Sequence, residues 1–221
     1  MMRLEAFEPA VMPTAGSTAR TVPLKLRVHR RNDAAREAIA ALMPAPHDDA
    51  AHRVVVGCEL GRRLVALVGL RAGADCRFVA ERYFRHSAER ELEHALCVPV
   101  ERRHVVEIDA LRVLRPHHAL HVFTGLVAFL HGAGFQWAVT SASERLFRRL
   151  EQLDFDPVEL ARTRDAGAAA IVCCGSVTAA YRRLSKHMAR DSGAEYWNAH
   201  TAVGRRFRID RAMHLLETVG S

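Results

Sequence analysis

The sequence predicts an α/β (α+β) fold, a mixed sheet with a central parallel strand–helix–strand unit flanked by helices. Three observations predict it. Residues 104–113 form a β-branched apolar run typical of a strand, and residues 116–130 read as a mostly apolar, buried helix that begins at a proline. Residues 136–140 form a second strand, followed by Ser141 and Glu144 at the spacing of a capping box. Strands joined through a helix in this way pair in parallel by a crossover connection.

The elements before this unit follow from turn and capping signals. An alternating run predicts a first strand, Asn32 or Asp33 can cap a helix that ends at Pro44, and Gly61-Arg62 marks the turn of a hairpin. A longer stretch before the central unit is helical in pattern. The predicted ranges are 24–29 for the strand, 33–42 for the helix, 53–60 and 63–70 for the hairpin, and 78–96 for the second helix.

The signals weaken after the central unit. Residues 157–161 indicate one helical turn, residues 168–174 a strand or a buried helix, and residues 177–190 a basic helix. We therefore expect three regions. These are a flexible amino-terminal arm over 1–22, one domain over 23–176, and a carboxyl-terminal helical appendage over 177–221 that packs on the same domain.

Composition limits the classes of function. The 221 residues are 49% hydrophobic, enough for one sizeable core, and carry a net charge of +7 that comes almost entirely from arginine. The charge indicates either a solvated surface or an acidic partner, such as an acyl carrier protein, an anionic membrane or a phosphate-bearing cofactor. We expect no nucleic-acid partner, because the arginine pairs are dispersed: 30/31, 62/63, 102/103, 148/149, 182/183 and 205/206.

The cysteines and the apolar segments suggest a location. The five cysteines form no C-x-x-C pair, which favours free thiols in a reducing compartment. Residues 1–16 lack the apolar core of a signal peptide, and the apolar stretch 120–130 is shorter than the ~20 residues of a membrane span. We expect a cytoplasmic protein without a transmembrane segment, with peripheral membrane contact left open.

The order of elements resembles the GNAT acyltransferase fold. More specifically, residues 83–100, 102–111, 137–143 and 153–157 resemble the thermostable hemolysin family, which looks like a distant relative of the autoinducer synthases and the long-chain N-acyl amino acid synthases. This resemblance implies a GNAT-like mixed sheet. It also implies an enzyme that moves a fatty acyl group from a thioester to the amine of an amino acid or a similar small acceptor. The alternative is a membrane-active haemolysin-type protein without enzymatic activity.

The resemblance places the acyl donor beside the end of the first central strand, at Leu111, Val113, Arg115, His117 and His118. GNAT enzymes hold the pyrophosphate of coenzyme A with small residues at the start of the following helix. Side chains fill both glycine positions in 115–120. We therefore expect the single phosphate of an acyl carrier protein's phosphopantetheine ahead of coenzyme A, as a co-substrate, and no tightly bound cofactor.

The acids of the first central strand are the candidate catalytic residues. Glu107 is the predicted general base for the attacking amine, and Asp109 is predicted to orient or bind that amine. Two residues apart on a strand they share a face, and repulsion within such a pair of carboxylates pushes one pKa upward, which suits a base near neutral pH. The alternative is that one or both acids simply pair with Arg102, Arg103 or Arg112.

The predicted acceptor-binding residues are Ser141, Ser143 and Phe147, with helix capping as the other interpretation of the serines. Phe147 occupies the place where related folds carry a proton-donating tyrosine. We predict no metal site, because His117 and His121 have no third ligand at suitable spacing.

Overall fold

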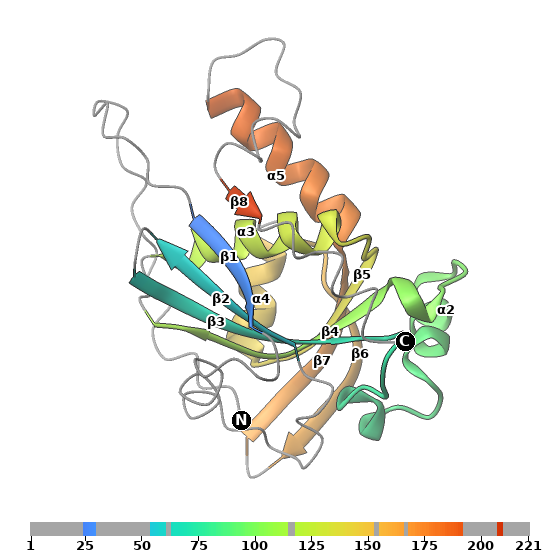
Figure 1. Cartoon of the computed structure of the whole chain (residues 1–221). Coiled ribbons are helices and arrows are strands. Elements are labelled where there is room, and N and C mark those ends of the chain that lie inside the picture. The colour runs from blue at the N-terminus through green and yellow to red at the C-terminus, as the bar shows by residue number, and fades with distance from the viewer. Residues whose placement is uncertain are drawn as a thin grey trace.

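The computed structural model describes residues 24–29, 54–60, 63–114, 118–152, 155–165, 168–191 and 207–209. Within these ranges one eight-stranded sheet has the order β6-β7-β5-β4-β3-β2-β1-β8 (Figure 1). The strands are β1 (Leu24–His29), β2 (Val54–Leu60), β3 (Arg63–Ala72), β4 (Val105–Val113), β5 (Trp137–Ala142), β6 (Val158–Asp165), β7 (Ala168–Ser176) and β8 (Phe207–Ile209). The helices are α2 (Ala88–Leu96), α3 (Ala119–Gly132), α4 (Glu144–Gln152) and α5 (Val177–Asp191), with 3-10 turns η2 (Ala80–Tyr83) and η3 (Arg102–His104).

The pairing of the strands confirms the predicted mixed sheet. β1 to β4 are antiparallel neighbours, β4 and β5 are parallel, and β7 lies between β5 and β6 antiparallel to both. The helix α3 joins β4 to β5, as the strand–helix–strand pattern predicted. The hairpin of β2 and β3 is also confirmed. β8 adds a parallel strand beside β1 that the sequence did not indicate.

The parallel pair β4–β5 is short. It runs from Val105 opposite Trp137 to Ile108 opposite Thr140, where the Thr140 hydroxyl donates a hydrogen bond of 3.0 Å to the Ile108 carbonyl oxygen. Beyond this point β4 stays paired with β3 and β5 stays paired with β7, but not with each other. The two central strands therefore separate in the middle of the sheet.

A β-bulge lies at the same level. The register of β3 and β4 shifts between Gly69 and Leu70, so that Asp109 is the extra residue of β4. Before the bulge Ile108 packs into the larger core cluster, and after it Leu111 and Val113 pack against that same cluster. The simple alternation of period two predicted for this strand therefore changes phase at Asp109.

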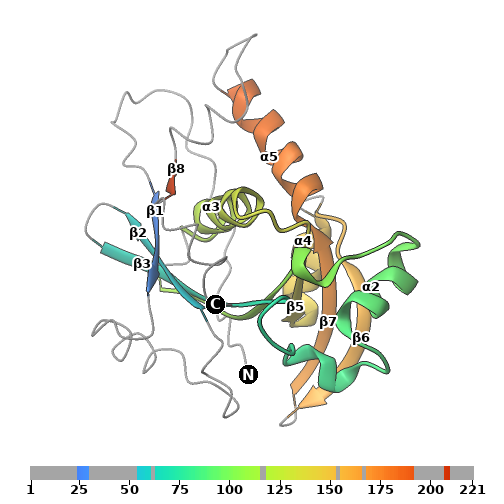
Figure 2. The same cartoon turned by 45° about the vertical axis from the view of Figure 1, so that its right-hand side comes forward.

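Two apolar layers cover opposite faces of the sheet. Val106 belongs to the larger cluster, which includes the buried faces of α3 and α5, and the adjacent Val105 belongs to a second cluster under η2 and α2. Figure 2 shows α3 and α5 lying together, away from α2. Among the described residues no helix is long and apolar enough to span a membrane.

Two predicted elements were wrong. The helix predicted over 78–96 is interrupted at residues 84–87, because the Glu91 carboxylate accepts the backbone N–H groups of Arg85 and His86 in place of helical carbonyls. Residues 157–161 lead into strand β6 and form no helical turn, and their apolar side chains pack in the second cluster. The predicted helix over 33–42 and the arm over 1–22 lie outside the described residues.

Capping of α4 also differs from the prediction. The strand β5 extends through Ala142, so Ser141 is a strand residue, and the Ser143 hydroxyl accepts the N–H of Leu146 at 3.3 Å. Ser143 is therefore the capping residue.

We expect Gly73→Ala to lower the free energy of unfolding by about 1–3 kcal/mol, because an added Cβ would overlap the Arg102 carbonyl oxygen and lie 3.0 Å from that of Val105. Urea denaturation measures the loss. Gly175→Ala is the matched control, since its Cβ would meet no atom closer than 3.9 Å. Equal stability of the two variants would contradict the close packing at Gly73.

Candidate active site

An apolar cavity lies where the central strands separate. Its volume is about 80 Å³, and it lies between the sheet and the helices α3, α4 and α5, partly open to solvent. Ile108 and Thr140, the last pair joining β4 to β5, both line it. Other lining residues come from α3, β7 and α5: Leu126, Leu130, Cys174, Val177 and Ala180. Such a lining suits a hydrocarbon chain and offers no charged side chain to a polar ligand.

Glu107 lies on the other face of β4 and is 3% exposed. Its carboxylate accepts hydrogen bonds from the backbone N–H groups of Val79, at 2.8 Å, and Ala80, at 2.7 Å. Burial raises the pKa of this carboxyl to about 7, although the two N–H donors and Arg71 oppose the rise. Glu107 thus holds the backbone at Val79 and Ala80 and also gains or loses a proton near neutral pH.

Asp109 forms a buried ion pair. Its carboxylate lies 3.0 Å from Nε of Arg71, and the two side chains are 2% and 1% exposed. Asp109 adds to the raised pKa of Glu107 by charge repulsion, and Arg71 acts in the opposite direction. The Asp109 carboxylate therefore raises the pKa of Glu107 from the same side of β4, as their spacing of two residues predicted. Asp109 pairs with Arg71 of β3, so the alternative that an acid pairs with an arginine holds for this residue, through an arginine that the sequence did not suggest.

A second buried carboxylate, that of Glu81, holds the segment that donates hydrogen bonds to Glu107. Glu81 accepts the N–H of Phe78 at 3.0 Å and that of Ala88, the first residue of α2, at 2.8 Å. It also accepts a hydrogen bond from the Arg102 guanidinium, at 2.6 Å, and lies 3.6 Å from Nε of Arg77. The hydrogen bonds keep the pKa of Glu81 below its usual value despite burial. Glu81 therefore holds the chain on both sides of η2, at Phe78 and at Ala88, and so fixes the backbone that donates to Glu107.

The predicted donor-binding residues are only partly placed. Leu111 and Val113 pack against the larger core cluster, and His118 is the residue before α3, where its side chain makes no capping hydrogen bond. Arg115 and His117 lie outside the described residues. Leu111 and Val113 therefore lie on the cavity face of β4 but do not line the cavity.

The predicted acceptor-binding residues do not gather at the cavity. Ser141 is paired with Val172 in the sheet, and Ser143 caps α4. Phe147 packs in a separate cluster with Ala142 and Ile171. From the same helix it is Leu150 that lines the cavity.

Sequence reasoning missed three contributions. Arg71 is a buried charge at the end of the apolar strand β3, and a lone charge in such a run is the signal that could have revealed it. Thr140 joins the two strands at their point of separation. Cys173 and Cys174 line the cavity, and burial raises the pKa of each thiol to about 12, so both are neutral there.

Solved structures share this fold. The CoA-dependent acyl-homoserine lactone synthase MesI superposes with a TM-score of 0.51 at 14% identity, over 79% of this chain and 97% of that one. The CoA-dependent acyl-homoserine lactone synthase BjaI, solved with SAM and isopentyl-CoA, gives 0.50 at 15% identity, over 77% of this chain and 84% of that one. At these identities the likeness shows the fold alone, which is the GNAT-like mixed sheet that the order of elements predicted.

Sequence comparison adds the family. A search of curated proteins finds no match. The model of the family described as thermostable hemolysin matches residues 48–171, more than half of the chain and including β2 to β6. The sequence motifs, the mixed sheet and this match agree, and the chain belongs to the thermostable hemolysin family.

Proposed function

We propose that this protein is an N-acyltransferase, which moves a fatty acyl group from a thioester to the amine of an amino acid or similar small acceptor. The observation that carries the proposal is the apolar cavity that begins where β4 and β5 separate. A hydrocarbon chain can enter the cavity without burying a charged side chain. Beyond Ile108 and Thr140 the facing edges of β4 and β5 are not paired with each other, and their backbone groups can hydrogen-bond a thioester arm. The fold shared with acyl-homoserine lactone synthases supports the same class of reaction.

In the proposed reaction the amine nitrogen attacks the thioester carbonyl carbon, the new C–N bond forms, and the C–S bond breaks. The products are an amide and a thiol. The amine loses one proton, and the departing thiolate takes one up from solvent. With a thiol pKa of about 8.5 the thiolate leaves with little assistance, so the step does not require an acid at the place of Phe147.

We assign the proton-accepting role to Glu107. A pKa of about 7 suits a general base, because the group is then substantially ionised near neutral pH and still binds a proton well. The hydrogen bonds from Val79 and Ala80 use one acceptor position on each oxygen, and a carboxylate has about four in all. Since Glu107 is buried, this role requires a water molecule to relay the proton. We give Asp109, paired with Arg71, the role of orienting the amine, and keep Ser141 and Ser143 as acceptor contacts, with the Ser143 hydroxyl shared with the cap of α4.

The expected carrier of the acyl group is an acyl carrier protein in the cytoplasm. The side chains at both glycine positions of 115–120 support this choice, as does the net charge of +7. The structurally similar synthases are described as CoA-dependent, which makes acyl-CoA the competing donor.

The direct test supplies purified protein with acyl carrier protein thioesters or acyl-CoA, together with a pool of amino acids, and searches for new acyl amides by mass spectrometry. We expect amides with at least one donor, and a loss of about 100-fold or more in turnover for Glu107→Gln. Full turnover of this variant would overturn the base assignment. Leakage of red cells with purified protein and no thioester would favour the membrane-active alternative.

The cavity predicts selectivity for chain length. Ala180→Leu places three more carbon atoms into the cavity lining, so we expect the preferred acyl chain to shorten while short donors still react. Competition among thioesters of increasing length measures the preference. Ala179→Leu is the matched control, because Ala179 is the exposed neighbour on the same helix. An unchanged preference in Ala180→Leu would show that the acyl chain lies elsewhere.

The raised pKa of Glu107 predicts a pH dependence of stability. Because burial lifts the pKa from 4.5 to about 7, the folded state binds the proton more tightly, and this contribution is present at low pH and lost as pH rises through about 7. The difference in unfolding free energy between the wild type and Glu107→Gln should therefore fall by up to about 3 kcal/mol between pH 4.5 and pH 8.

Urea denaturation across that pH range checks this difference. Glu81→Gln is the control, since the pKa of Glu81 is lowered and its contribution changes only below pH 4.5. A flat difference for Glu107→Gln would contradict the pKa.

A further inference from the structure

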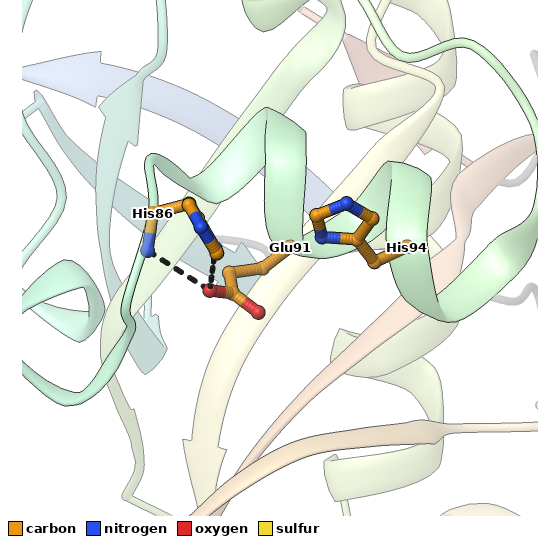
Figure 3. Close-up of side chains that lie close together, drawn as sticks. All are labelled: His86, Glu91 and His94. Atoms are coloured by element: carbon orange, nitrogen blue, oxygen red, sulfur yellow. Dashed lines mark hydrogen bonds and ion pairs between the residues drawn. The ribbon is translucent and has the colours of Figure 1, made fainter.

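Three potential metal ligands converge at the start of α2. His86 belongs to the loop before the helix, and Glu91 and His94 lie one turn apart on the helix itself. One ligand atom from each of the three lies within 4.8 Å of the others. Figure 3 shows the carboxylate of Glu91 and the ring of His86 side by side, with the ring of His94 turned toward them.

Local contacts hold this arrangement. One oxygen of Glu91 accepts the backbone N–H of His86 at 2.9 Å and lies 3.1 Å from Nδ1 of the same residue. The rings of His86 and His94 meet edge to face, with centroids 5.4 Å apart. The second oxygen of Glu91 has no hydrogen-bond partner among the described residues, so it can bind a cation while the first keeps the loop in place.

We infer that His86, Glu91 and His94 form a binding site for a divalent transition-metal ion, with Zn²⁺ as the representative ion. Two imidazoles and one carboxylate are a donor set that zinc and its neighbours favour, and solvent can complete the coordination. Zinc–nitrogen bonds of about 2.0–2.1 Å require the ligand atoms to approach to roughly 3.4 Å. Small rotations of the exposed His86 and His94 side chains supply this approach.

The bound ion would act on the segment that holds Glu107. It would link the loop before α2 to the last turn of that helix, and the hydrogen bonds of Glu81 already join α2 to the residues around η2. Because a site of this kind is incomplete in the unfolded chain, metal binding stabilises the folded state. The three ligands line no part of the cavity, so zinc binding can be measured separately from the proposed acyl transfer.

No metal site was predicted from the sequence, where His117 and His121 are the histidines at helical spacing and have no third ligand. The spacing H-x4-E-x2-H of this cluster crosses the boundary of a helix. Helical periodicity therefore does not place its first histidine near the other two.

The test titrates chelator-treated full-length protein with ZnCl₂ by calorimetry and by thermal denaturation. We expect saturable binding of one equivalent at this site, with a rise in Tm, and no comparable effect of MgCl₂, which prefers oxygen ligands. His86→Gln and His94→Gln should each weaken binding at least about tenfold, the loss seen even for outer-shell partners of a metal. Glu91→Gln keeps an oxygen for the backbone N–H groups and removes the charge, so it should weaken zinc binding while leaving the circular dichroism unchanged.

His104→Gln is the control for binding by other histidines. It should bind zinc like the wild type, because His104 lies outside the cluster. Zinc affinity that is unchanged in both His86→Gln and His94→Gln would overturn the proposal, as would a wild type with no saturable binding.

Discussion

The ion pair between the partly exposed Arg102 and the buried Glu81 is the constraint on which the connection between β3 and β4 depends. The guanidinium also donates to the carbonyl oxygens of Gly73 and Cys76, at 2.9 Å each, and to Glu89 at 2.7 Å. It therefore connects the end of β3, the turn η2 and the first turn of α2. The buried carboxylate of Glu81 is tolerated because Arg102 and two backbone N–H groups donate to it, and loss of Arg102 would leave that charge without its cation. The long connection between β3 and β4 is folded around this ion pair.

Much of the architecture could be predicted from the sequence because it follows from local periodicity. The strand β4, the helix α3 and the strand β5 have clear patterns, and so does the hairpin around Gly61. The failures have nonlocal causes. The helix predicted over 78–96 is broken where Glu91 captures loop N–H groups, and β6 is a strand because β7 lies beside it. Neither the contact of Glu91 with the loop nor the pairing of β6 with β7 can be read from the pattern of the segment alone.

The candidate site was predictable in part for the same reason. Glu107 and Asp109 were expected to share a face, and both lie with Arg71 on one side of β4. Their environments were not predictable, because Arg71 comes from β3, 38 positions away, and the donors of Glu107 come from a turn 27 and 28 positions away. The cavity depends on residues from β7 and α5, well beyond the central unit. Spacing within a motif carries no information about such distant neighbours.

The strand order has a consequence for synthesis on the ribosome. β7 lies between β5 and β6, although it follows both in sequence, so the edge of β5 has no partner until residues 168–176 have emerged. Until then the nascent chain exposes an open strand edge beside an apolar surface that α5 later covers. An incomplete chain of this protein is therefore a natural client for chaperones that shield unpaired strands.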